Sequence, residues 1–227
     1  MDHYPYDLQE QGDGRIIELL RPLLTERRAE RIESILDRRT YNLTAALDGL
    51  GDTGNMSAIL RTCDAFGLQS VHVVTTSPGF QIGRRVSAGS HKWLDIHPHE
   101  TATECGEALK AQGYQLLAAH LEGAIPIGEA DFSRPTALVF GNEQRGVCDA
   151  MLAQCDGRVL IPMEGFSRSL NVSVAAGVAL YHAVCDRIAR LGRTGDLSDD
   201  QRRALRERFY RRSVRESDMV IRKANLS

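Results

Sequence analysis

Apolar residues near the start of the chain recur every three or four positions, which is the period of an α-helix. These positions are Ile16, Leu19, Leu20, Leu23, Leu24, Ile32, Ile35 and Leu36. We therefore expect helix from Gly14 to about Arg39. We also expect Pro22 to interrupt it, because proline lacks the amide hydrogen that a helix needs.

The middle of the chain alternates short apolar runs with longer segments. The runs predict strands at 43–47, 70–75, 114–119, 136–140 and 158–161. The longer segments predict helices at 55–66, 101–112, 149–154 and 171–190. This alternation predicts an α/β fold, with a parallel sheet and helices on both of its faces. The pattern alone favours an unknotted, doubly wound sheet, since true knots are rare.

The two ends of the chain differ from the middle. Residues 192–195 have the composition of a linker, and a charged helix is expected from Ser198 toward Lys223. The sequence thus predicts an N-terminal helical extension over 1–40, a central domain over 41–190 and a basic helical extension over 191–227. Residues 187–227 hold twelve Lys and Arg against six Asp and Glu, whereas the whole chain has a net charge of −2. A basic tail indicates a polyanion contact, with a solvated helix face as the alternative.

The overall composition is that of an ordinary soluble protein, with 42% hydrophobic and 26% charged residues. No stretch is expected to reach the apolar length of a membrane span, and the acidic, polar start of the chain does not predict a signal peptide. The five cysteines show no CxxC spacing. Their odd number and the absence of this spacing predict reduced thiols in the cytoplasm and argue against a disulfide framework or a zinc site.

A turn with glycine at both ends, Gly141-Asn-Glu-Gln-Arg-Gly146, follows the apolar run that ends at Phe140. Ligands of open α/β sheets bind beyond the carboxyl ends of strands, and glycine lets the backbone approach a ligand closely. The turn lacks the GKS or GKT of a phosphate loop, and GxGxxG is absent, so a nucleoside triphosphate or NAD is a poor fit. An ordinary strand-to-helix turn is the alternative.

Two further segments begin helices beside apolar runs. The first contains Asn55, which is expected to cap its helix, and Arg61 near the border of the buried stripe. An arginine in that position usually extends to solvent or forms a salt bridge. The second segment contains Pro162, which suits a strand end, and then Ser169 and Asn171, either of which could cap the following helix.

These three segments, in this order, resemble the motifs of the SPOUT superfamily of RNA methyltransferases, and most closely its tRNA guanosine-18 2′-O-methyltransferase branch. The similarity extends from about Leu43 to Asp186. It implies a deep trefoil knot in the C-terminal part of the sheet, in place of the unknotted sheet. It also implies S-adenosyl-L-methionine as cofactor, tRNA as substrate and a homodimer with an active site completed across the two-fold interface. The methyl transfer that the resemblance implies requires no metal, and we expect no His/Cys cluster that could bind one.

The resemblance also implies roles for individual residues. Cofactor contacts would come from Ala119, Leu138, Gly141, Asn142, Gly146, Ile161, Met163, Ser169 and Leu170. Catalysis would depend on Arg61, Asn55, Glu143, Ser169 and Asn171. RNA would be bound by Arg84, Arg85, Lys92, Arg168, Arg202 and Arg211. Because a guanidinium has a pKa above about 12, we expect Arg61 to stabilise developing negative charge and not to accept a proton.

Three hypotheses about function stay open at this point. The first is methylation of guanosine 18 in the D-loop of tRNA, and the second is the same chemistry on another tRNA position or on ribosomal RNA. The N-terminal segment is shorter than the added RNA-binding domain of many ribosomal relatives, which favours tRNA. The third is an inactive RNA-binding module, against which the retained Asn55, Arg61, Glu143, Ser169 and Asn171 argue.

Overall fold

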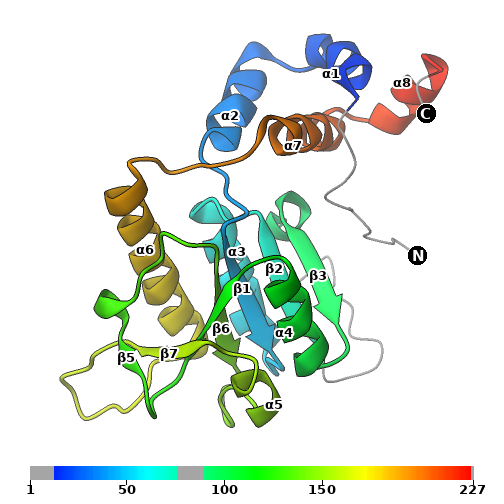
Figure 1. Cartoon of the computed structure of the whole chain (residues 1–227). Helices are drawn as coiled ribbons and strands as arrows, with labels where there is room; N and C mark the ends of the chain where they lie inside the picture. Colours follow the sequence, from blue (N-terminus) through cyan, green and yellow to red (C-terminus); the bar gives the residue numbers. More distant parts are fainter. Residues whose placement is uncertain (1–12, 76–88, 226–227) are drawn as a thin grey trace. The chain divides into compact units, whose positions relative to one another are not determined.

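The computed structural model describes residues 13–75 and 89–225, which divide into two compact units (Figure 1). One unit comprises residues 40–194. The other is made from both ends of the chain, before Thr40 and after Thr194. Each unit has its own buried side chains and is described by itself.

Residues 40–194 contain a seven-stranded sheet whose strand pairs are all parallel. The strands lie in the order β3-β2-β1-β6-β4-β7-β5. Their bounds are β1 (Leu43–Asp48), β2 (Ser70–Val74), β3 (Asp95–His99), β4 (Gln115–Ala119), β5 (Ile125–Pro126), β6 (Thr136–Gly141) and β7 (Gly157–Leu160). Strands β1, β2 and β6 are buried along their whole length, as expected of parallel strands that are covered on both faces.

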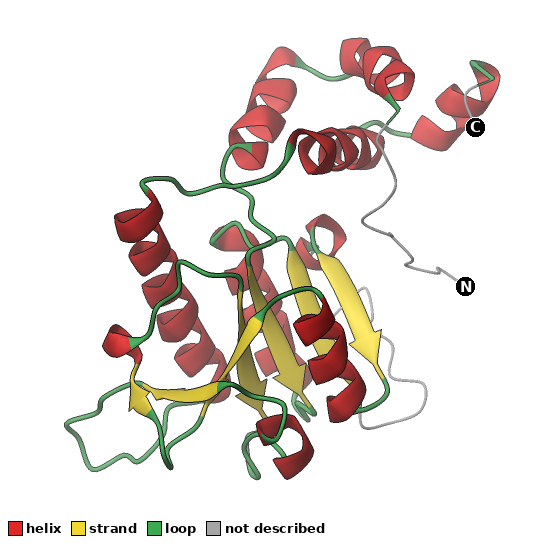
Figure 2. Cartoon of the chain, viewed as in Figure 1, coloured by secondary structure: helices red, strands yellow, loops and turns green. Residues whose placement is uncertain are grey.

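Helices cover both faces of this sheet (Figure 2). They are α3 (Thr53–Ala65) and α6 (Val172–Leu191) on one face, and α4 (Ala102–Ala111) and α5 (Asp149–Leu152) on the other. The first face buries Ile59 of α3 and Leu180 of α6 against β1 and β6. The second buries Leu109 of α4 and Met151 of α5. The result is a three-layered α/β unit.

The predicted parallel α/β fold is confirmed, and the predicted strands and helices of the middle region agree with the structure to within two residues at each end. Two strands were not predicted. β3 contains Pro98, which a strand tolerates here because β3 lies at the edge of the sheet. β5 has only two residues. The trefoil knot stays a prediction from the family resemblance.

The second unit consists of helices from both chain ends. They are α1 (Gly14–Leu20), a 3₁₀ turn (Arg21–Leu23), α2 (Glu26–Leu36), α7 (Asp199–Ser213) and α8 (Ser217–Lys223). Pro22 lies in the 3₁₀ turn, so the predicted interruption is confirmed. The prediction of one final helix from Ser198 to Lys223 is wrong. The chain leaves the helix after α7 and passes through Glu216, whose φ is 55°, before α8 begins.

Apolar packing and ion pairs join the two chain ends in this unit. Ile32 of α2 and Leu205 and Phe209 of α7 are almost fully buried. Glu33 of α2 accepts hydrogen bonds from Nε and Nη2 of Arg206 at 2.6 and 2.7 Å. The Arg206 guanidinium holds the pKa of Glu33 below its usual value. The basic surface of α7 is therefore partly turned toward an acidic residue of its own unit.

Among the described residues, α6 is the one helix that is long and apolar enough to cross a membrane, judged by length and composition only. The expectation that no stretch reaches that length is therefore wrong for α6. A single helix of this kind is a weak indication of a membrane span, because core helices of soluble proteins meet the same condition. Ala176, Ala179 and Leu180 of α6 are buried within the unit.

Candidate functional site

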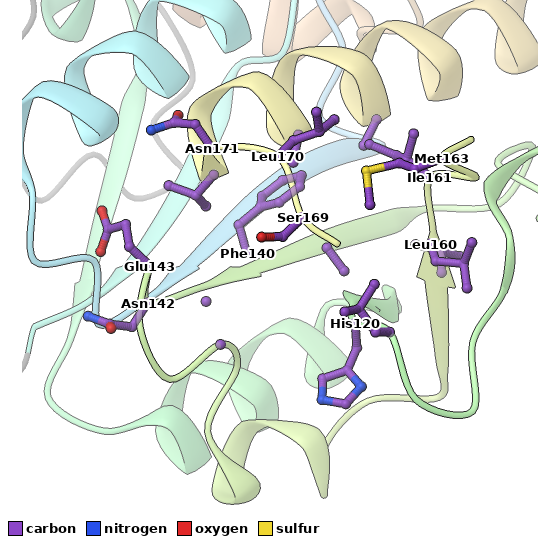
Figure 3. Close-up of a pocket in the computed structure, with 18 of the residues that line it drawn as sticks. His120, Phe140, Asn142, Glu143, Leu160, Ile161, Met163, Ser169, Leu170 and Asn171 are labelled. Carbon is purple, nitrogen blue, oxygen red and sulfur yellow. The ribbon is translucent and has the colours of Figure 1, made fainter. Parts of the chain in front are cut away.

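A pocket of about 690 Å³ opens at the carboxyl ends of β4, β6 and β7 (Figure 3). Its walls come from the loops that follow these strands and from the start of α6. Apolar side chains of Phe140, Ile161 and Leu170 lie beside the polar side chains of His120 and Glu143. This volume and this mixed lining suit a small organic ligand, and strand ends are where open α/β sheets bind ligands.

The turn after β6 is closed by its own backbone. Asn142 and Gly146 exchange two backbone hydrogen bonds, with N–O distances of 2.9 and 2.8 Å. A Cβ atom at Gly141 would overlap the backbone of Gly146 and Val147. Gly141 also lines the pocket, so the predicted approach of a ligand to this glycine stays a prediction. The close approach that requires glycine there is to the chain's own backbone.

Three polar side chains from separate segments form a hydrogen-bonded network beside the pocket. Asn171 Nδ2 donates to Asn55 Oδ1 at 3.1 Å, and Asn55 Nδ2 donates to Glu143 Oε1 at 2.9 Å. Burial acts to raise the pKa of Glu143, but the hydrogen bonds from Asn55 and from backbone amides outweigh it and hold the pKa below its usual value. Glu143 is therefore an ionised carboxylate at neutral pH.

Helix capping explains how the side chains of Asn55 and Asn171 are oriented. Asp52, not Asn55, caps α3, because its Oδ1 accepts a hydrogen bond from the Asn55 backbone amide at 2.7 Å. The predicted cap at Asn55 is wrong, and the Asn55 side chain instead bridges Asn171 and Glu143. Asn171 does cap α6, with Oδ1 accepting from the Ser173 amide at 2.9 Å. Its Nδ2 group is left to donate to Asn55.

Most residues predicted to contact a cofactor line the pocket. They are Ala119, Gly141, Asn142, Gly146, Ile161, Met163, Ser169 and Leu170. Leu138 does not line it, because its side chain is fully buried in the core. Phe140, His120 and Ile127 also line the pocket and were not among the predicted residues. Phe140 could have been found, since it ends the apolar run before the turn, whereas Ile127 comes from a short 3₁₀ turn that no local pattern links to the pocket.

Arg61 lies apart from the pocket lining, exposed on α3 about one and a half turns after Asn55. A single chain therefore brings Asn55, Glu143 and Asn171 together, and Arg61 is not part of their hydrogen-bonded network. Its exposed position leaves it available to a substrate or to a second chain.

The residues predicted to bind RNA lie in different surroundings. Lys92 and Arg168 are exposed. Arg84 and Arg85 lie outside the described residues. Arg202 Nη2 is 2.6 Å from Asp37 Oδ1 and 3.3 Å from Glu33 Oε2, and Arg211 Nε is 2.7 Å from Glu207 Oε1. The last two arginines are therefore held by carboxylates of their own unit.

The fold and the pocket define an α/β protein with a site for a small organic ligand at its strand ends. Residues 42–181 match the sequence profile of the SpoU rRNA Methylase family. Over 165 residues the chain is 43% identical to a tRNA (guanosine(18)-2′-O)-methyltransferase from Thermus thermophilus, covering 72% of this chain and 85% of that protein. The chain therefore belongs to the SpoU methylase family, and the resemblance found in its motifs is confirmed.

Solved structures agree with this assignment. The A. aeolicus TrmH/SpoU tRNA modifying enzyme matches with a TM-score of 0.75 and 31% identity, over 84% of this chain and 98% of that chain. The SpoU methyltransferase AviRb from Streptomyces viridochromogenes, solved in complex with AdoMet, matches with a TM-score of 0.60 and 30% identity, over 66% of this chain and 62% of that chain.

We expect Gly141→Ala to lower the free energy of unfolding by about 1–3 kcal/mol, because the added methyl group overlaps backbone that cannot move without opening the turn. Urea denaturation of the two proteins measures the difference. Gly165→Ala is the control, since its added Cβ would come no closer than 4.0 Å to the nearest atom, the Ser167 amide nitrogen. Equal stability of the two variants would contradict the structural role of Gly141.

Proposed function

We propose that this protein transfers a methyl group from S-adenosyl-L-methionine to the ribose 2′-hydroxyl of guanosine 18 in tRNA, and that it does so in the cytoplasm. The observation that carries the proposal is the strand-end pocket with the network of Asn55, Glu143 and Asn171 at its edge, in a chain of the SpoU methylase family. The name of the Thermus thermophilus relative supports the choice of nucleotide.

The pocket residues fit this cofactor. Phe140, Ile161 and Leu170 offer apolar contact to an adenine ring. When bound, the cofactor supplies a methyl group on a positively charged sulfonium. Two carboxylates, Glu122 and Glu143, line the pocket against one guanidinium, Arg145, and this balance favours a cation there.

As the new carbon–oxygen bond forms, the carbon–sulfur bond of the methyl donor would break and leave a neutral thioether, and the 2′-hydroxyl proton would pass to solvent water. Arg61 does not accept this proton, because a guanidinium stays protonated in proteins. We assign Arg61 the role of binding a neighbouring phosphate and stabilising the negative charge that develops on the ribose oxygen. Asn55 and Asn171 hold Glu143 in place, and the Ser169 hydroxyl lies on the pocket wall within the loop before α6.

We expect Arg61→Ala to reduce kcat at least about 100-fold while the Kd for S-adenosyl-L-methionine stays unchanged, because the side chain acts on the transition state and lies outside the pocket. Mass spectrometry of a tRNA transcript after reaction locates the methyl group at position 18. Arg193→Ala, which removes another exposed arginine, is the control. Substantial turnover by Arg61→Ala would assign Arg61 a structural role, and a wild-type protein that leaves guanosine 18 unmodified would contradict the function itself.

The helical unit offers a basic surface for tRNA. Thr25, Arg27, Arg28 and Arg31 line a shallow depression at the start of α2, together with Glu30. Arg27 and Arg31 are exposed there, unlike Arg202 and Arg211, which carboxylates hold. We therefore place the phosphate contact of this unit mainly on α2, and the contact of the other unit on Lys92 and Arg168.

We expect the double variant Arg27→Gln, Arg31→Gln to bind tRNA more weakly and with a flatter salt dependence. Each lost phosphate contact removes about 0.7–0.9 from the slope of log affinity against log salt concentration. Filter binding over a salt series measures the slope. Arg15→Gln is the matched control, because Arg15 is exposed on α1 and paired with Asp13 at 3.0 Å. An unchanged slope in the double variant would exclude this surface.

We further propose a homodimer that forms through α6. Val174, Val178 and Tyr181 are large apolar residues of α6 that remain exposed. Tyr181 lies beside Phe66, directly after α3, with ring centroids 5.7 Å apart. A dimer formed through this surface removes apolar area from water, and it places the exposed Arg61 of α3 near the partner chain.

We expect Val178→Glu to yield a monomer at micromolar concentration, because a charge on this face opposes burial. Analytical ultracentrifugation measures the mass, and Leu23→Glu, at an exposed leucine of the other unit, is the control. If Arg61 acts across the interface, mixing inactive Arg61→Ala and Glu143→Gln chains restores roughly a quarter of the wild-type activity, since half the dimers then hold one intact site. A fully active Val178→Glu monomer would contradict the dimer.

Ribosomal RNA is the second candidate substrate, because the matching family profile is named for rRNA methylases. Methyl transfer to tRNA and rRNA transcripts, compared under the same conditions, decides between them. The hypothesis of an inactive RNA-binding module predicts neither cofactor binding nor transfer to either transcript.

A further inference from the structure

Two histidines and a cysteine converge at one edge of the sheet, apart from the pocket. His72 lies in β2, His99 in β3 and Cys105 in α4, which packs on both strands. One nitrogen of each imidazole and the Cys105 sulfur all lie within 4.8 Å of one another. All three residues are buried. The expectation that no His/Cys cluster could bind a metal is therefore wrong.

The parallel register explains this convergence. His72 pairs with His97, and Val74 pairs with His99, so the strands place His99 two residues beyond the position opposite His72. His72 Nδ1 and His99 Nε2 are 3.0 Å apart, and the His97 ring stacks on His72 with centroids 4.7 Å apart. Metal–ligand bonds of about 2.0–2.3 Å to nitrogen and sulfur need donor atoms about 3–4 Å apart. The two imidazole nitrogens already have this spacing, and the Cys105 sulfur lies within 4.8 Å of both.

The second nitrogen of His99 adds an independent observation. His99 Nδ1 is buried and makes no hydrogen bond, and Glu104 Oε1 lies 3.6 Å from it, just beyond hydrogen-bonding distance. Histidines that bind a metal through one ring nitrogen usually direct the other toward a carboxylate, which orients the ring. His99 thus directs Nε2 at the cluster and Nδ1 at a carboxylate.

We propose that His72, His99 and Cys105 bind one Zn²⁺ ion. Two imidazoles and one thiolate suit a borderline-soft metal ion and do not suit Mg²⁺ or Ca²⁺, which prefer oxygen. These three side chains would supply three of the four positions of a tetrahedral ion. The ion connects β2, β3 and α4, and it stabilises the edge strand β3, in which Pro98 lacks an amide hydrogen. This role is structural and does not depend on the proposed methyl transfer.

Zinc and cobalt titrations of the chelator-treated full chain test the proposal. We expect one equivalent of Zn²⁺ to bind, and Co²⁺ in its place to give a near-ultraviolet thiolate-to-metal absorption band. Cys105→Ala should lose the band and bind at least about 100-fold more weakly, since even outer-shell changes cost 10–100-fold. Cys63→Ala is the matched control, because Cys63 is an equally buried cysteine in the other core cluster. It should bind as the wild type does.

Thermal unfolding provides a second measurement. Zn²⁺ should raise the Tm of the wild type and of Cys63→Ala but not that of Cys105→Ala or His99→Gln, because only the folded site binds the ion. Circular dichroism confirms that each variant is folded, and His99→Gln keeps the test valid if Cys105→Ala does not fold. Absence of stoichiometric binding, or binding that survives both substitutions, would overturn the proposal. The second result would assign the metal to an exposed thiol such as Cys148 or Cys185.

Discussion

The close backbone approach at Gly141 determines where the groups around the pocket lie. Because no side chain stands at this position, the turn after β6 closes directly against its own strand end. The Asn142 side chain then donates to a carbonyl of the loop after β1 at 2.9 Å, and Asp48 at the end of β1 accepts a hydrogen bond from the backbone after the turn at 2.7 Å. The turn is thereby fastened to β1, and Glu143 faces Asn55 at the start of α3.

Much of the sheet could be predicted because its central strands are mostly apolar and buried along their whole length, and that pattern is visible in the local sequence. β3 could not be predicted in the same way. Its sequence, Asp95-Ile-His-Pro-His99, has one aliphatic side chain, and its buried polar residues Asp95 and His99 have partners that are remote in sequence: Tyr41 and Gln69 for Asp95, and His72 for His99. The packing of α2 on α7 could not be predicted from local sequence either, because the Glu33–Arg206 ion pair joins residues that are remote in sequence.

Glycine and proline at strand ends predicted where the pocket lies. The hydrogen-bond network beside it could not be predicted from the sequence. Asp52 and Asn55 are both good helix caps and stand three residues apart, so local sequence does not decide which of them starts α3. Because Asp52 caps the helix, the side-chain amide of Asn55 remains available to Asn171, which comes from a distant segment. The His72–His99–Cys105 cluster was missed for a similar reason, since parallel register and one helix bring its members together.

The helical unit is interrupted by the whole of residues 40–194, so in chain order the sheet is an insertion between α2 and α7. The ribosome releases α1 and α2 before the sheet, whereas Leu205 and Phe209, which complete their core, are synthesised after it. The sheet can therefore finish folding while the N-terminal helices still expose Ile32 and its apolar neighbours. Assembly of this unit waits until α7 has been synthesised, and before then chaperones and proteases can recognise the exposed apolar residues of α1 and α2.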